Sequence, residues 1–96
     1  MKRSRALEIL RQSKETLAVR YGVTRLALFG STARNAAQVD SDVDILVAFD
    51  GPANSRRYFG VQFLLEDLLG NPVDLVTDKA LRPELRAAVE AEAIYV

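Results

Sequence analysis

The segment at residues 30–47 reads GSTARNAAQVDSDVDILV and contains the most informative motifs of the chain. The apolar run at residues 26–29 comes directly before it and is typical of a buried strand, so Gly30 and Ser31 lie where that strand ends. Backbone amides become available at such a point, and glycine lets a ligand approach the backbone closely. The Ser31 hydroxyl adds a further donor for phosphate oxygens. We interpret Gly30-Ser31 as a candidate phosphate-binding turn, although this dipeptide also occurs in ordinary turns.

Two acids, Asp42 and Asp44, stand two residues apart at the start of a second apolar run, residues 43–49. Alternate side chains of a strand share a face, so these two carboxylates are expected to point the same way. Carboxylates held on one face repel, and either one takes up a proton or a cation binds both. The alternative is a solvated strand end. A phosphate-binding turn followed by paired carboxylates suits metal-dependent nucleotidyl transfer.

The composition restricts the kinds of site that the chain can form. Its 96 residues predict one domain, residues 1–96. The absence of cysteine and histidine excludes disulfides and thiolate or imidazole zinc sites. Any metal must then be held by oxygen ligands, which suit magnesium, manganese or calcium. No run of 18 apolar residues occurs, so we expect a cytoplasmic protein without a membrane partner.

Charge is unevenly distributed along the chain, although the formal net charge is zero. Residues 1–34 carry eight Lys and Arg against two Glu. This basic half could attract a nucleotide or RNA, or could simply neutralise the acidic half of the fold. We favour the second interpretation, because most of these charges fit the solvated side of a helix, and we expect no direct binding of nucleic acid.

The first half of the chain predicts a helix followed by two strands. Apolar residues recur at helical spacing over residues 4–21, and residues 24–29 and 43–49 have the character of strands. The polar link at residues 35–41 is too short for a crossover helix, so the two strands are expected to be antiparallel neighbours. This arrangement would bring Ser31 close to the pair of acids.

The second half begins with a predicted helix from about Ser55 to a stop at residues 70–72, Gly-Asn-Pro. Its apolar face includes Val61, Leu64, Leu65 and Leu68. Gly60 is expected to weaken the start of this helix.

We therefore expect Arg56 and Arg57 to lie in a solvated loop.

A short strand at residues 73–76, a helix at residues 81–93 and a terminal edge strand at residues 94–96 complete the predicted order. The last helix is expected to direct Leu85, Ala88 and Val89 inward. Together these elements predict an α+β fold with helices packed against a small mixed β-sheet.

One further acid, Asp74, lies between Val73 and Leu75 in the third predicted strand. A carboxylate in an otherwise buried strand needs a partner. If this strand lies beside the strand at residues 43–49, Asp74 joins Asp42 and Asp44, and three acids can hold two divalent cations.

These motifs together resemble the signature of the DNA polymerase β-like nucleotidyltransferase superfamily: Gly30-Ser31, ten residues, Asp42-Val43-Asp44, and the later strand acid Asp74. The patterns Gly-Ser-x-Ala-Arg and Ser-Asp-x-Asp-Ile-Leu-Val, with LGNPVDLV at residues 69–76, are similar to those of the minimal nucleotidyltransferases, or MNT proteins. The resemblance covers nearly the whole chain and implies the nucleotidyltransferase fold. Asn35 departs from it, because a glycine usually follows the Ala-Arg pair in such proteins.

The resemblance implies an in-line attack on the α-phosphorus of a nucleoside triphosphate, most often ATP, with release of pyrophosphate. It implies a catalytic and metal-binding role, with two Mg²⁺ ions, for Asp42, Asp44 and Asp74. Asp74 would also assist deprotonation of the acceptor hydroxyl. It implies a nucleotide-binding role for Gly30 and Ser31, and Arg34 would contact phosphate or brace the loop.

The resemblance also implies a partner, because a chain of this size lacks a domain for the acceptor. MNT proteins resemble antitoxins that adenylylate a tyrosine of a HEPN-domain toxin, so a hetero-oligomer with such a toxin is expected. The alternative is a catalytically weak binding module that neutralises a HEPN-type partner by complex formation. A nucleotidyltransferase for a small molecule is less favoured, since those enzymes usually carry an additional acceptor-binding domain.

Overall fold

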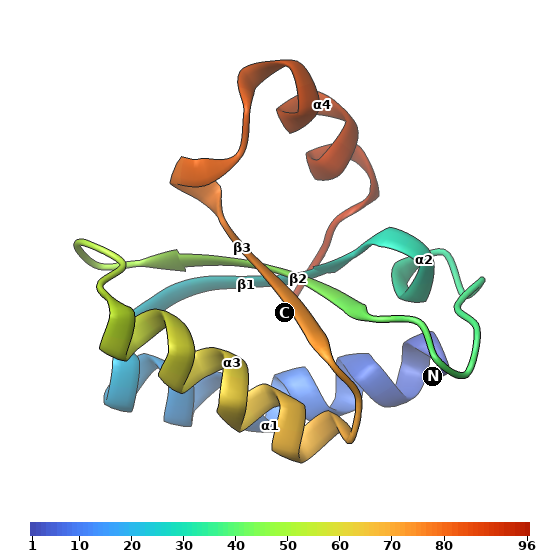
Figure 1. Ribbon diagram of the computed structural model, residues 1–96, viewed down its shortest axis with the longest axis horizontal. Helices are drawn as coiled ribbons and strands as arrows, with labels where there is room; N and C mark the ends of the chain where they lie inside the picture. Colours follow the sequence, from blue (N-terminus) through green and yellow to red (C-terminus); the bar gives the residue numbers. More distant parts are fainter.

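The computed structural model describes residues 1–96 and shows a four-stranded sheet with helices on both faces (Figure 1). Two long helices lie together on one face, and the last helix stands over the other (Figure 1). No helix has both the length and the apolar composition needed to cross a bilayer. In chain order the elements are α1 (Arg3–Tyr21), β1 (Val23–Phe29), α2 (Gly30–Ala33), β2 (Val43–Phe49), α3 (Ser55–Leu69), β3 (Val73–Thr77), the 3-10 helix η1 (Asp78–Ala80), α4 (Pro83–Glu92) and β4 (Ile94–Tyr95).

The sheet has the strand order β3-β2-β1-β4 and is mixed. Strands β1 and β2 are antiparallel neighbours, as their short link predicts. Strand β3 runs parallel to β2, with α3 as the crossover between them, and β4 pairs antiparallel with β1. The α+β fold expected from the sequence is therefore confirmed.

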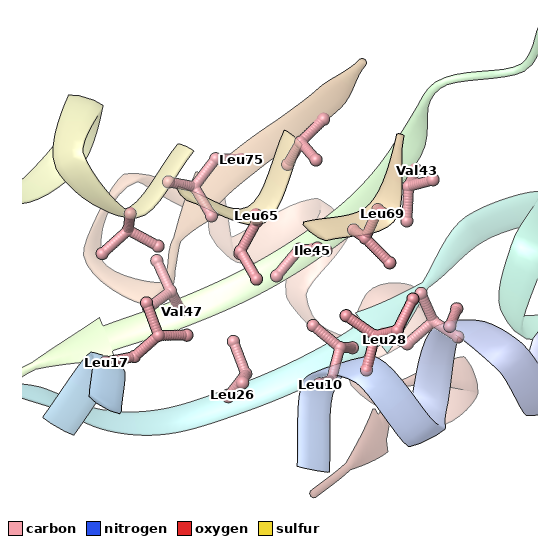
Figure 2. Packing of buried hydrophobic residues seen from close by; sticks show 14 of the residues in the cluster. Leu10, Leu17, Leu26, Leu28, Val43, Ile45, Val47, Leu65, Leu69 and Leu75 are labelled. Atoms are coloured by element: carbon pink, nitrogen blue, oxygen red, sulfur yellow. The ribbon is translucent and has the colours of Figure 1, made fainter. Parts of the chain in front are cut away.

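The core lies between the sheet and the pair of helices α1 and α3 (Figure 2). Alternate strand residues supply it, among them Leu26 and Leu28 of β1, Ile45 of β2 and Leu75 of β3. Leu10 of α1 fills the helix side (Figure 2). Because neighbouring strand residues point to opposite faces, the positions between these core residues face away from α1 and α3.

Helix α3 begins at Ser55, so the expectation that Arg56 and Arg57 lie in a loop is wrong. The side chain of Asn54 caps the helix by accepting the N–H of Arg57 at 2.9 Å. The Arg57 guanidinium also pairs with Asp50 at 2.7 Å. Gly60 does not disrupt the helix; a Cβ there would overlap the ring of Tyr21, so this glycine allows α1 and α3 to pack closely.

The expectation that the last helix directs Leu85, Ala88 and Val89 inward is wrong for Leu85 and Ala88, which are exposed, whereas Val89 is half-buried. Helix α4 contains no buried residue, and 51% of Leu85 is exposed. The helix stands over the sheet face opposite α1 and α3 (Figure 1). One of its connections is Arg86, whose Nη2 donates to the carbonyl of Asp78 in η1 at 2.8 Å. Polar contacts therefore help to hold α4 in place.

The outer edge of β3 is covered by three polar side chains of α3. The Tyr58 hydroxyl donates to the carbonyl of Leu75 at 2.6 Å, and the Gln62 amide donates to the carbonyl of Val73 at 3.2 Å. The Glu66 carboxylate accepts the N–H of Val73 at 3.0 Å. Their spacing of four residues places all three on one side of the helix.

Candidate active site

Two of the predicted acids, Asp44 and Asp74, lie in register on neighbouring strands. Asp44 of β2 pairs with Asp74 of β3 in the parallel register. Both alternate with core residues, so they project from the sheet face opposite α1 and α3. Asp44 is half-buried, whereas Asp74 is exposed. The sequence expectation that β3 brings Asp74 beside the strand of Asp44 is therefore confirmed.

Strand β2 begins at Val43, the bound that the sequence predicts, so Asp42 stands outside the strand. Asp42 lies in the connection before the strand and is exposed. It still acts on Asp44, since its negative charge is among the causes that raise the pKa of Asp44. Strand alternation alone therefore does not fix the relative orientation of Asp42 and Asp44.

The electrostatic environment of Asp44 disfavours its charged form. Burial, followed by the charge of Asp74, a side-chain hydrogen bond with Asp74 and the charges of Asp42 and Glu92, raises the pKa of Asp44 to about 6. A cation bound there would remove the repulsion between these carboxylates. The oxygen donors fit Mg²⁺ in chemical type, although no group of three or more acids is gathered closely enough to form a ready metal site.

Gly30 is where the turn after β1 comes closest to Asp44. Its φ of +72° lies in the left-handed region, and a Cβ at this position would overlap Oδ2 of Asp44. Glycine is therefore required both by backbone conformation and by space. Ser31, the next residue, is half-buried at the start of α2. The turn and Asp44 are adjacent, as the sequence predicts.

A fourth acid, Glu92 at the end of α4, reaches the same turn. Its Oε1 accepts the N–H of Gly30 at 3.0 Å, and its Oε2 accepts Nη1 of Arg34 at 2.8 Å. The amide expected to meet phosphate is therefore bonded to a carboxylate. Sequence reasoning missed Glu92, because one of several acids in a short helix gives no signal that it contacts a turn 62 residues away.

Asn35 retains the backbone conformation that glycine would adopt. Its φ is 58°, in the left-handed region, which asparagine tolerates better than most residues. Its side-chain oxygen accepts the N–H of Arg3, the first residue of α1, at 3.1 Å. This contact caps a helix whose own N-cap residue, Lys2, supplies no side-chain bond. The departure at Asn35 therefore keeps the bend and adds a link to α1.

The acids lie outside the surface cavities of the molecule. The cavity of about 350 Å³ between α1 and α3 is lined by residues such as Ile9 and Leu64, on the other side of the sheet. None of the cavities includes Asp42, Asp44 or Asp74. The candidate site is thus an open part of the sheet face.

Comparison with known proteins agrees with this arrangement. Residues 10–96 match the model of the nucleotidyltransferase domain family. Protein adenylyltransferase MntA from Thermococcus cleftensis is 40% identical over 88 residues, which cover 92% of this chain and 89% of that protein. A solved structure of a protein provisionally assigned as a minimal nucleotidyltransferase has a TM-score of 0.82 and 39% identity, and the match covers 98% of this chain and 95% of that one.

A more distant match concerns the fold alone. It is to a solved complex of tri-AMPylated Shewanella oneidensis HEPN toxin with MNT antitoxin, with a TM-score of 0.66 and 19% identity. The match covers 99% of this chain and 71% of that chain. The family match and the relatives of about 40% identity decide the assignment: this chain belongs to the nucleotidyltransferase domain family, among its MNT-like members.

Proposed function

We propose that this chain is a magnesium-dependent protein adenylyltransferase that transfers AMP from ATP to a HEPN-domain toxin and so acts as its antitoxin. The observation that carries the proposal is the pair Asp44 and Asp74, in register on an open sheet face beside the Gly30 turn. The relative named protein adenylyltransferase MntA supports the reaction, and the HEPN–MNT complex of similar fold supports the kind of partner.

Asp42, Asp44 and Asp74 are the residues that would hold two Mg²⁺ ions. Their carboxylate oxygens are suitable ligands, and the raised pKa of Asp44 reflects burial first and then nearby negative charge, which a cation would offset. When bound, magnesium would neutralise triphosphate charge and make the acceptor hydroxyl easier to deprotonate.

The chain's own residues would orient the nucleotide and accept a proton. The acceptor oxygen forms a bond to the α-phosphorus, and the bond from that phosphorus to the bridging oxygen of the β-phosphate breaks. Pyrophosphate leaves with the electron pair of that bond. Asp74, which is exposed, would take the hydroxyl proton. Ser31 and Arg34 would bind the triphosphate oxygens.

The acceptor that we propose is a tyrosine hydroxyl of the toxin. The acids lie on an open part of the sheet, so a side chain presented by a second protein can reach Asp74. Because ATP is the donor, we place the reaction in the cytoplasm. Modification of the toxin, in addition to contact with it, would then account for neutralisation.

Intact-mass spectrometry tests this proposal directly. The chain is incubated with ATP, MgCl₂ and a HEPN-domain protein from the same genome, and the mass of the HEPN protein is followed. We expect one or more added AMP units, located on tyrosine by fragmentation. The variant Asp42→Ala/Asp44→Ala should add none, whereas Glu8→Ala/Asp67→Ala, which removes two exposed acids elsewhere, should act like the wild type.

Two outcomes would contradict the proposal. A tight complex with no change in mass would favour the alternative, a binding module that neutralises its partner by occlusion. Full transfer by Asp42→Ala/Asp44→Ala would show that these acids are not the catalytic centre.

A further inference from the structure

Glu92 joins the two ends of the turn that follows β1. One carboxylate oxygen accepts the N–H of Gly30 at 3.0 Å, and the other accepts Nη1 of Arg34 at 2.8 Å. Gly30 begins α2, and Arg34 is the C-cap residue that follows it. A single side chain therefore sets the position of the Arg34 guanidinium relative to Gly30 and, through Gly30, relative to Asp44.

The position of Glu92 follows from the register of the sheet. In the antiparallel pair of β1 and β4, Leu28 lies opposite Ile94. Gly30 follows the end of β1, and Glu92 precedes Ile94 by two residues, so this pairing brings the end of α4 close to the start of α2. The pairing of β4 with β1 therefore anchors the end of α4 that carries Glu92, although α4 itself contains no buried residue.

Arg34 is a side chain whose function would benefit from such support. The side chain of Arg34 is 56% exposed, while that of Glu92 is 31% exposed. An exposed arginine loses conformational freedom when it binds a ligand, and a fixed partner reduces that loss. The guanidinium has five N–H donors, and the contact with Glu92 uses Nη1, so other donors remain for phosphate oxygens.

We propose that Glu92 is a positioning residue that holds Arg34 ready for the triphosphate of the nucleotide. This role rests on the proposed nucleotidyltransferase function. It also changes which residues of the turn are expected to contact phosphate. The N–H of Gly30 is used by Glu92, so phosphate contacts fall to Ser31 and Arg34, while Gly30 provides the close approach to Asp44.

The opposite role would be competition, with the Glu92 carboxylate occupying the place of a phosphate at the Gly30 amide. The two roles predict opposite effects of removing the carboxylate. Loss of a positioning residue weakens nucleotide binding, whereas loss of a competitor strengthens it.

Isothermal titration calorimetry with AMP-PNP and MgCl₂ separates these roles. We expect Glu92→Ala to weaken binding roughly tenfold, as is typical when a residue that orients a ligand-binding group is lost. Arg34→Ala should weaken binding as well. The double variant should bind no more weakly than Arg34→Ala alone, because Glu92 acts through Arg34. Glu92→Gln, whose amide oxygen can still accept one of these bonds, should recover part of the affinity.

Glu90→Ala is the matched control. Glu90 is also an acid of α4, but it pairs with Arg86, away from the turn. The Glu90→Ala variant removes the same charge from the same helix and should leave the dissociation constant for AMP-PNP unchanged. Thermal melts of each variant check that the fold is retained.

Several results would overturn the proposal. Unchanged or tighter binding by Glu92→Ala would exclude positioning, and tighter binding would identify competition. Additive losses in the double variant would show that Glu92 does not act through Arg34. If the wild type itself binds no AMP-PNP, the proposed function fails and this role fails with it, whereas normal wild-type binding confines a failure to Glu92.

Discussion

Asp44 lies directly beside Asp74 in a parallel strand pair, although the whole of α3 separates them in the sequence. Neighbouring positions in register project to the same face, so the strand pairing that builds the sheet also forces two carboxylates together. The fold thus maintains a repulsion that protonation or a bound cation relieves. Local instability at this position is a direct consequence of the arrangement.

Asp44→Asn should stabilise the protein at neutral pH when divalent cations are absent. The pKa of Asp44 is raised from 3.8 to about 6 in the folded state, so between these values the folded state binds a proton that the unfolded state does not. The contribution of this group to the free energy of unfolding therefore falls as pH rises through that window and remains low above it. Asparagine carries no charge at any pH, so Asp44→Asn does not lose stability in this way.

Thermal melts in EDTA at pH 7.5 and pH 4 test this prediction. Asp44→Asn should melt at a higher temperature than the wild type at pH 7.5, and the difference should shrink at pH 4. Asp67→Asn, an exposed acid of α3, should show no such pH-dependent difference. A destabilised Asp44→Asn at pH 7.5 would contradict the prediction.

Asp74→Asn should reduce the rate of AMP transfer by roughly a hundredfold or more, because it removes the group proposed to accept the hydroxyl proton. Binding of AMP-PNP with magnesium should persist through Asp42 and Asp44. The measurement pairs single-turnover transfer with calorimetry. Loss of nucleotide binding in Asp74→Asn would instead place Asp74 in the primary metal site.

Gly30→Ala should be far more damaging than Gly70→Ala, although both glycines have a φ of +72°. A Cβ at Gly70 meets nothing within 4 Å. Gly70→Ala should therefore lower the free energy of unfolding only by the strain of a left-handed backbone at alanine, about 1–2 kcal/mol. A Cβ at Gly30 also overlaps Asp44, which raises the expected loss to roughly 2–5 kcal/mol and should displace the carboxylate. Urea unfolding and transfer assays on both variants test the difference; equal stability losses would show that space beside Asp44 is not limiting.

Asn35→Ala should lower the free energy of unfolding by about 1–2 kcal/mol, since it removes the cap on Arg3 and leaves a poor residue at positive φ. Asn35→Gly should lose less, because glycine adopts that conformation freely while forgoing the cap. Chemical denaturation of the three proteins ranks them. An alanine variant as stable as the wild type would rule out a capping role.

Much of this architecture could be predicted from local patterns. The helical spacing of apolar residues in residues 4–21, and the apolar runs on either side of Gly30, indicate their elements because they depend on near neighbours in the chain. The short link between those runs correctly predicts antiparallel pairing. The position of Asp74 beside Asp44 could be predicted only on the condition that β3 pairs with β2.

The failures share a physical cause, which is dependence on contacts far apart in the sequence. Leu85 has the spacing of a core residue, but α4 buries none of its residues and Leu85 remains exposed. Gly60 suggests a weak helix start, yet close packing against Tyr21 explains its presence. Glu92 gives no local signal, because its contact with Gly30 joins residues 62 positions apart, near the place where β4 pairs with β1.

The polar side chains that cover the outer edge of β3 restrict how a second protein can meet Asp74. Tyr58, Gln62 and Glu66 already satisfy backbone groups of Val73 and Leu75. An incoming extended segment would have to break these bonds before it could join the sheet, which disfavours recognition by strand addition. In the proposed reaction, an acceptor would therefore approach the acids from the open face of the sheet with a projecting side chain. Partners that present a residue from a helix or a loop tip suit this direction better than partners that offer an extended strand.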